Sequence, residues 1–408
     1  MIIEKRIKAF EKLGFGLFVH FGYYSVLGKG EWSKFFMEYT WDEYLKSLST
    51  FDPKVDWAEE LVTTAKNAGC KYITLTTRHH DGFSLYDTCG LNTYDAPHTC
   101  GRDLIREFVD ACNRNDIQPF FYHTLLDWHE ESYQSNFKEY LVYLRKSIEI
   151  LCKNYGKIGG LWFDGMWDKP EEDWEEDALY GLIRSYQPEA MIINNTGLHC
   201  RGELGHIELD SVTFERGRPE PINMEGAPKY VASEMCETVC DHWGYAEMDF
   251  NYKPTAELIK TFAICRRYGS NLLLNIGPKG DGSLRTMDKA TLEVLGKWHE
   301  LNREALHNAM PCPIEIEGKP HNFMLREGDN YYLFITDLPG RETDHVVIGG
   351  DYVDPLNTFA FDRPIKAMHW LDTEEAVSFT QSGGKVTVKV APRRYSESFV
   401  IRVAKITV

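Results

Sequence analysis

The chain lacks an excess of positive charge, a long apolar run and a secretory leader pattern. Its formal net charge is −17 over 408 residues, which argues against nucleic acid or an anionic membrane as a partner, because both require a basic surface. No apolar run approaches the roughly 20 residues of a transmembrane helix, and the first residues do not resemble a secretory signal. We therefore expect a cytoplasmic protein with no nucleic-acid and no membrane partner.

Metal-ligand motifs are also missing. The 10 cysteines are scattered without a C-x-x-C pair, which favours buried reduced thiols over a disulfide framework or a zinc site. Cys236 and Cys240 lie four residues apart, but no second ligand pair accompanies them. H-x-H and H-E-x-x-H are absent as well. The sequence thus predicts neither a metal site nor a cofactor.

What is present, up to about residue 305, is a regular alternation of strand and helix patterns. This alternation predicts a parallel sheet with crossover helices. Helical periodicity occurs near residues 56–68, 103–114, 135–155, 174–186, 255–268 and 286–306. Apolar runs predict strands near 14–22, 72–77, 118–124, 159–165, 190–195, 208–215, 230–237 and 270–277. Eight strands of this kind are the number in an α/β fold of the (β/α)8, or TIM-type, barrel.

Beyond about residue 310 the period changes from helical to alternating. Short strand patterns occupy 330–338, 345–350, 365–371, 377–390 and 398–408, with Gly383 and Gly384 as a hairpin turn. Such strands predict an antiparallel β-sandwich. We expect a catalytic barrel over residues 1–308 and a C-terminal β-sandwich domain over 309–408, with a loop around Pro311 to Pro313 between them.

Polar residues directly follow several of the apolar runs. A barrel of this type builds its site at the carboxyl ends of its strands, so these residues are expected to converge on one pocket. The run at 72–77 ends in Arg78-His79-His80-Asp81. Other runs end at His20, Tyr122-His123, Asp164, Asn194-Asn195 and Glu215, and Glu31-Trp32 and His242-Trp243 lie in neighbouring loops.

Three kinds of function use such residues. A metal-dependent hydrolase would bind zinc through histidines, but neighbouring residues of a regular strand point to opposite sides, so His79 and His80 would not easily share one ion. A glycosidase needs two carboxylates, together with polar groups for hydroxyls and aromatic faces for the sugar. A non-catalytic carbohydrate-binding protein on the same scaffold would need neither carboxylate.

Asp164 is the most informative of the acidic residues. It ends an otherwise apolar strand, and Gly165 after it leaves room for a ligand, although the spacing suits a helix cap or a turn equally well. Glu215 ends the run at 211–215 in the same way. Taken alone, Glu215 would be interpreted as a surface carboxylate paired with Arg216 or Arg218.

Several long motifs resemble, in the same order, those of glycoside hydrolase family 29, the α-L-fucosidases. They are GFGLFVHFGYYSVLGKGEWS, RHHDGFSLYDT, FYHTLLDW, LWFDG, HWGY and TAELIKTFAICRRYGSNLLLNIGPKGDGSL. The likeness covers the barrel nearly end to end and is weak only in the C-terminal sheet, which is a β-sandwich in that family. It implies a retaining exo-glycosidase that releases α-L-fucose from fucosylated glycans or glycosides without a cofactor. A homo-oligomer is a separate expectation that no motif carries.

The resemblance also implies roles for individual residues. Asp164 becomes the nucleophile, and Glu215 the general acid/base, with Glu234 and Glu237 as alternatives. The implied sugar-binding residues are His20, Glu31, Trp32, His79, His80, Tyr122, Trp162 and Trp243. His79 and His80 would both turn inward if a local kink, permitted by Gly82, follows the strand.

One departure concerns an arginine that family members place after the strand that here ends in Asn194-Asn195. Asn195-Thr196-Gly197 stands in its place, so Arg201, Arg216 or Arg218 would have to substitute for it. The cleaved linkage and the aglycone are not predicted.

Overall fold

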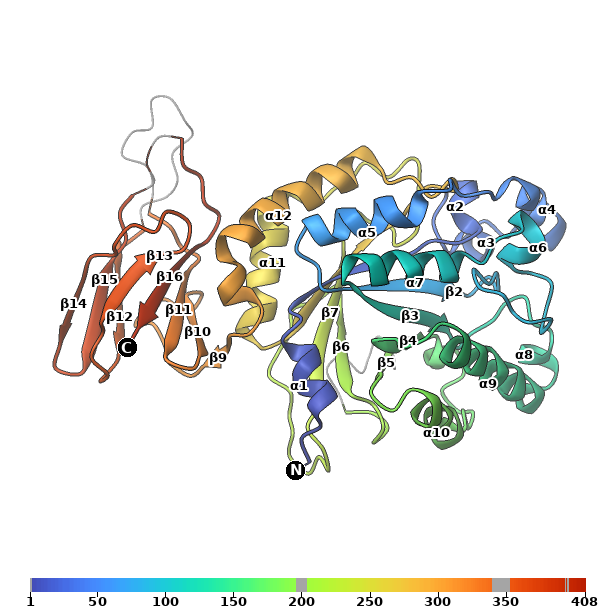
Figure 1. Cartoon of the computed structure of the whole chain (residues 1–408), viewed down its shortest axis with the longest axis horizontal. Helices are drawn as coiled ribbons and strands as arrows, with labels where there is room; N and C mark the ends of the chain where they lie inside the picture. Colours follow the sequence, from blue (N-terminus) through green and yellow to red (C-terminus); the bar gives the residue numbers. More distant parts are fainter. Residues whose placement is uncertain (1, 196–203, 340–352, 393, 395) are drawn as a thin grey trace. The chain divides into compact units, whose positions relative to one another are not determined.

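The computed structural model describes residues 2–195, 204–339, 353–392, 394 and 396–408. The chain divides into two compact units, one formed by Met1–Lys253 with Ser270–Val294 and the other by Pro254–Gly269 with Leu295–Val408. Figure 1 shows the course of the chain through both. The expected domain boundary at residue 308 stays a prediction.

Within the described residues, eight parallel strands close a barrel in chain order. The last strand pairs with the first, Leu274 opposite Leu17, so the sheet has no free edge. The predicted (β/α)8 barrel is confirmed. Its strands are β1 (Phe15–Val19), β2 (Tyr72–Arg78), β3 (Gln118–Thr124), β4 (Gly160–Asp164), β5 (Met191–Asn195), β6 (Ser211–Glu215), β7 (Ala232–Thr238) and β8 (Asn271–Ile276).

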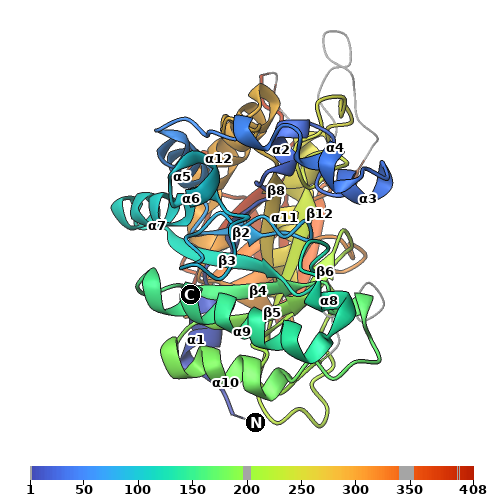
Figure 2. The same cartoon turned by 90° about the vertical axis from the view of Figure 1, so that its right-hand side faces the viewer.

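Longer helices alternate with these strands, and short helices occupy the loops. Figure 2 shows α5, α7, α9 and α10 on the outside of the barrel strands. The longer helices are α1 (Lys5–Glu11), α5 (Trp57–Asn67), α7 (Leu104–Asn115), α9 (Phe137–Asn154), α10 (Glu176–Tyr186), α11 (Thr255–Arg267) and α12 (Thr286–Leu306). The short ones are α2 (Tyr24–Leu27), α3 (Ser33–Phe36), α4 (Trp41–Leu45), α6 (Ala96–Cys100), α8 (Ser132–Ser135), η1 (Leu48–Thr50) and η2 (Met166–Asp168).

Large aromatic residues from alternate strand positions fill the barrel interior. Tyr72, Phe120 and Trp162 are buried there, as expected for inward-facing residues of strands with a period of two. Gly160 makes room for this packing, because a Cβ at that position would lie 2.6 Å from the ring of Phe120. Phe10 of α1 packs against the same cluster.

The second unit contains the predicted antiparallel sandwich. One sheet has the order β13–β16–β11–β10–β9 and the other the order β12–β15–β14, and a shared core of residues such as Leu333, Phe359 and Val388 lies between them. The first sheet comprises β9 (Met310–Cys312), β10 (Phe323–Glu327), β11 (Asn330–Ile335), β13 (Ala367–Trp370) and β16 (Arg402–Thr407). The second comprises β12 (Leu356–Ala360), β14 (Phe379–Ser382) and β15 (Lys385–Lys389).

The second unit differs from the sequence expectations at several of its strands. The loop expected around Pro311 is wrong in part, because Met310–Cys312 pairs with β10 as a short strand. The strands β10 and β12 were not expected. The strand pattern at 345–350 lies outside the described residues.

Candidate active site

A cavity of about 340 Å³ is lined by residues of the barrel strands and of the loops that follow their carboxyl ends. Its size lies within the roughly 300–1,000 Å³ of typical small-molecule sites. The two predicted catalytic residues and the eight predicted sugar-binding residues all line it. The lining consists of Phe18, His20, Glu31, Trp32, His79, His80, Tyr122, Trp162, Asp164, Trp167, Asn195, Glu215, Cys236 and Trp243.

The two alternative acids of β7 do not line this cavity. Cys236 faces it, so Glu234 lies deeper on the same inward side and Glu237 points the other way. Glu234 accepts hydrogen bonds from the hydroxyl of Tyr72 and from Trp162 Nε1, the latter at 2.9 Å. Glu237 forms a salt bridge of 3.1 Å with Lys253.

Asp164, the last residue of β4, is surrounded by hydrogen-bond donors. Its Oδ2 accepts from Tyr122 Oη at 3.1 Å, and its Oδ1 accepts from Trp167 Nε1 at 3.2 Å. Burial raises the pKa of this carboxyl, while the bonds from Trp167 and Tyr122 and a weaker one from Asn195 oppose that rise. The surrounding donors therefore favour the ionised form against the cost of burial.

Asn195, the last residue of β5, connects Asp164 to Glu215. Its Nδ2 lies 3.4 Å from Asp164 Oδ1 and 2.8 Å from Glu215 Oε2. Thr213 donates to Asn195 Oδ1 at 3.1 Å, which fixes the orientation of the amide. Asp164 Oδ1 and Glu215 Oε2 are therefore at most 6.2 Å apart, because both lie within hydrogen-bond distance of the same Nδ2 atom.

His79 and His80 both line the cavity, although they are neighbours in the chain. β2 ends at Arg78, and the register of its pairing with β3 shifts between Thr76 and Arg78. The two imidazoles therefore lie beyond the regular strand, with ring centroids 4.2 Å apart. Gly82 has a φ of 82°, so the irregular backbone extends on both sides of the pair.

The hydrogen-bond network assigns one tautomer to His80. Thr124 donates its single hydroxyl proton to the carbonyl of Leu126, so it accepts from His80 Nδ1, which lies 2.7 Å from it. Burial lowers the pKa of His80 to about 3, and a neutral ring protonated on Nδ1 leaves Nε2 as an acceptor. This Nε2 lies 3.6 Å from Asp164 Oδ2.

His20 is held in the same way. Asn275 donates through Nδ2 to the carbonyl of Trp243 at 2.7 Å, so its Oδ1 accepts from His20 Nδ1 at 2.6 Å. Burial lowers the pKa of His20 to about 3. Both histidines are neutral at neutral pH and each keeps Nε2 free of a proton.

A pocket with two facing carboxyls, neutral histidines and aromatic walls has the composition of a glycosidase site. A family model described as α-L-fucosidase matches residues 3–304. The chain belongs to the α-L-fucosidase family. The family and its enzyme class, glycoside hydrolase, are thereby confirmed as expected.

Individual members of the family are similar over most of their length. The tissue α-L-fucosidase of Macaca fascicularis is 28% identical over 345 residues, which cover 76% of this chain and 70% of that protein. The α-L-fucosidase of Dictyostelium discoideum is 23% identical over 430 residues, covering 95% and 89%. Among solved structures, α-L-fucosidase isoenzyme 1 from Paenibacillus thiaminolyticus matches with a TM-score of 0.84 and 26% identity, covering 99% and 98%.

Glu31 is a third carboxyl in the pocket of this fucosidase-family chain. Its Oε2 accepts from the backbone N–H of Gly244 at 2.7 Å, and burial raises its pKa. A Cβ at Gly244 would lie 3.0 Å from the backbone nitrogen of Glu31, so a larger residue would crowd this close approach. Glu31 thus ties the first βα loop to the loop that carries Trp243.

Of the arginines proposed to replace the family's missing one, Arg216 and Arg218 are among the described residues, and neither lines the cavity. Arg216 has a φ of 46°, and its guanidinium lies 5.0 Å from the ring centroid of Trp243. Arg216 is thus an exposed residue in contact with Trp243, which lines the pocket. Arg218 is exposed, and Arg201 lies outside the described residues.

Four residues that line the cavity were not among the predicted site residues: Phe18, Trp167, Asn195 and Cys236. Asn195 stands at a strand end and was noticed there, but no role was assigned to it. Trp167 lies three residues after Asp164 in the loop that follows β4, so a search of βα loops for aromatic residues would have found it. Phe18 and Cys236 are apolar and carry no such signal.

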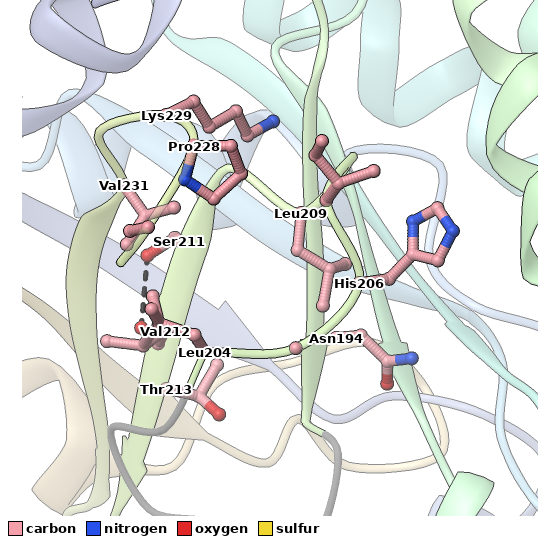
Figure 3. A pocket seen from close by; sticks show the side chains of 13 residues that line it. Asn194, Leu204, His206, Leu209, Ser211, Val212, Thr213, Pro228, Lys229 and Val231 are labelled. Carbon is pink, nitrogen blue, oxygen red and sulfur yellow. Dashed lines mark hydrogen bonds between the residues drawn. The ribbon is translucent and has the colours of Figure 1, made fainter. Parts of the chain in front are cut away.

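Other hollows have a different character. A cavity of about 40 Å³, lined without any Asp or Glu by residues such as Leu209 and Val231, is far too small for a sugar. Figure 3 shows it, with the hydrogen bond from the Ser211 hydroxyl to the carbonyl of Val212. A wider hollow of about 530 Å³ lies at the amino ends of β3 to β5, the end of such barrels that serves stability rather than catalysis.

Among the residues that the structure describes, no three or more His, Cys, Asp or Glu side chains are grouped in a way that could hold a metal ion. Among the described helices, none is both long and apolar enough to cross a membrane.

Proposed function

We propose that the protein is a retaining exo-α-L-fucosidase that releases α-L-fucose from fucosylated glycans or glycosides. Asp164 attacks the anomeric carbon while Glu215 gives its proton to the leaving oxygen, so that the glycosidic bond breaks and a glycosyl-enzyme forms. Glu215 then takes a proton from water, whose oxygen displaces Asp164. The reaction needs no cofactor.

The observation that carries this proposal is the distance between the two carboxyls. Their nearest bridged oxygens lie within 6.2 Å, because Asn195 contacts both. Retaining enzymes have carboxyls about 5–5.5 Å apart, whereas inverting enzymes need roughly 6.5–9.5 Å to admit a water. The bridged separation therefore favours retention.

The polar contacts of the pocket suit the two roles. Tyr122, Trp167 and Asn195 all donate to Asp164, which stabilises a carboxylate nucleophile. Glu215 stands on the next strand but one, and the neutral amide of Asn195 lies between the two carboxyl groups.

The walls suit a 6-deoxy sugar. The Nε2 atoms of His20 and His80 can accept hydrogen bonds from hydroxyl groups. Phe18, Trp162 and Trp243 supply apolar faces, against which the methyl group of fucose can be buried. In the same proposal Glu31 and His79 are further polar contacts of the sugar. Trp32 is a further aromatic contact.

The test uses an aryl α-L-fucoside with wild type, Asp164→Ala and Glu215→Ala. Both variants should lose almost all activity on a substrate with a poor leaving group. Azide should rescue Asp164→Ala with the β-fucosyl azide as product, and Glu215→Ala with the α-anomer. Proton NMR of the wild-type reaction should show α-L-fucose as the first product, and first release of the β-anomer would overturn retention.

Further variants identify the acid/base. Glu31→Ala, Glu234→Ala and Glu237→Ala go through the same azide assay, and an α-fucosyl azide from any of them, with none from Glu215→Ala, would reassign the role. A non-catalytic fucose-binding protein would be stabilised by fucose yet release no nitrophenol. A metal-dependent hydrolase would lose its activity in EDTA. Cytoplasmic localisation and a homo-oligomeric state stay predictions.

A further inference from the structure

Five aromatic residues form a continuous surface beginning inside the pocket, here called the aromatic ridge: Trp32, Phe35, Phe36, Trp128 and Trp167. Trp32 and Trp167 line the cavity, and their rings are stacked with centroids 6.0 Å apart. Trp32 also contacts Trp128 at 5.0 Å, Phe35 at 5.6 Å and Phe36 at 5.7 Å. The ridge therefore connects the catalytic cavity to rings outside it.

The outer end of the ridge is exposed. Phe35 is 57% exposed and Phe36 is 74% exposed, although the phenylalanine side chain is one of the residues most often buried in proteins. Both rings belong to α3, a single helical turn that directly follows Trp32. Exposed apolar rings that adjoin a pocket are more typical of a binding surface than of isolated surface residues.

The exposed rings are held in place rather than loose. Phe35 stacks on Trp128 with centroids 5.9 Å apart and contacts Phe36 edge-on at 5.3 Å. Trp128 in turn contacts the ring of His80 at 5.5 Å. A ligand that lies on these rings consequently meets a surface that is already ordered, which lowers the entropic cost of binding.

The reacting atoms lie at the inner end of the same ridge. Trp167 donates to Asp164 at 3.2 Å, so the ridge begins beside the proposed nucleophile. In an exo-glycosidase the terminal sugar fills the pocket, and the group attached to it extends out of the mouth. That group is the part of the substrate that can reach Phe35 and Phe36.

We propose that the aromatic ridge binds the leaving group of the substrate, and that this leaving group is a sugar of a fucosylated oligosaccharide whose apolar face stacks on Phe35 and Phe36. The inference rests on the proposed fucosidase function. Sugar rings present C–H faces that pack well on aromatic rings. The ridge carries no ionisable side chain, and the net charge of −17 disfavours an anionic lipid surface as the occupant.

The experiment compares two substrates in Phe35→Ala and Phe36→Ala. One is whichever α1,2-, α1,3-, α1,4- or α1,6-fucosylated oligosaccharide wild type cleaves fastest, and the other is α-L-fucosyl fluoride, whose leaving group is too small to touch the ridge. The ratio of kcat/KM for the oligosaccharide to kcat/KM for the fluoride should fall about 2- to 10-fold for each ring removed, mainly through KM. Phe36→Trp, which keeps an aromatic ring at this position, should retain the wild-type ratio.

The control is Tyr186→Ala, which removes a 39% exposed ring at the end of α10, shortly before β5 begins. It should leave the ratio unchanged. An unchanged ratio in both phenylalanine variants, or equal losses on both substrates, would overturn the ridge as a leaving-group site. A wild type that cleaves neither substrate would instead overturn the proposed function, so the two failures are distinguishable.

Discussion

One side-chain amide, that of Asn195, donates to the carboxyls of both Asp164 and Glu215. The contact depends on sheet register, because Asp164 and Asn195 are direct partners in the β4–β5 pairing. Thr213 of β6 fixes the amide from its oxygen side. A neutral donor thus stands between the two acids and limits how far apart they lie.

Removing this amide should impair catalysis and alter the pH profile. Hydrogen bonds to charged groups contribute about 1.5–3 kcal/mol, so we expect Asn195→Ala to lower kcat/KM about 10- to 100-fold on an aryl fucoside. Because Asp164 loses a donor that favours its ionised form, its pKa should rise further. The acidic limb of the kcat/KM profile should therefore move to higher pH.

Asn194→Ala is the matched control for that experiment. The Nδ2 of Asn194 donates to Tyr180 Oη at 2.9 Å, on the far side of the same strand from the carboxyls. Its loss should lower thermal stability without moving the acidic limb. If both variants shift the limb equally, the Asn195 contact has no specific role in the site.

Trp167 should affect the nucleophile through its indole N–H rather than through its ring alone. Trp167→Phe keeps an aromatic face but removes the donor to Asp164 Oδ1. We expect kcat to fall several-fold and the acidic limb to rise, since a donor to the carboxylate is lost. In Trp174→Phe, which removes a bond to the carbonyl of Lys169, neither quantity should change.

The histidines should not titrate in the working range of the enzyme. Burial lowers the pKa of His20 and of His80 to about 3, so both should remain neutral from about pH 4.5 upwards. Nitrogen-15 NMR of histidine-labelled protein should show Nδ1 protonated and Nε2 unprotonated in each ring. A step near the ordinary histidine pKa of about 6.5, lost in His80→Gln, would contradict this assignment.

The sequence predicts the barrel and most of the pocket because strand ends carry their polar residues in a recognisable position. His20, Asp164 and Glu215 follow apolar runs, and parallel strands bring such residues to one end of the barrel. The Asn195 bridge was not predictable, since it depends on which residues of β4, β5 and β6 stand side by side. Register is a property of the assembled sheet and cannot be predicted from the sequence of any single strand.

Short elements were missed for a different reason. A single turn such as α3 (Ser33–Phe36) or a three-residue strand such as β9 (Met310–Cys312) is too short to show a period of 3.6 or 2. The aromatic ridge depends on α3, so it too was not predicted from the sequence. Glu234 shows a further limit: the family resemblance made it an alternative acid, and only the depth of its burial distinguishes it from Glu215.

That burial leads to a prediction about stability. Glu234 is 1% exposed, and burial raises its pKa to about 7 although Tyr72 and Trp162 donate to it. An unfolded glutamate has a pKa of about 4.3. Between these values the folded state binds more protons than the unfolded state, so the free energy of unfolding should fall as pH rises from about 4.5 to 7.

Glu234→Gln should remove this dependence, because glutamine resembles the protonated carboxyl and does not ionise. At pH 5 the variant and wild type should have similar free energies of unfolding, and at pH 8.5 the variant should be the more stable by about 2–3 kcal/mol. Denaturant unfolding at both pH values measures the difference. Glu237→Gln on the same strand, whose carboxyl contacts Lys253 outside the barrel interior, should not reproduce it. An equal gain with pH in both variants would mean that the effect does not arise from burial of Glu234 beneath Trp162.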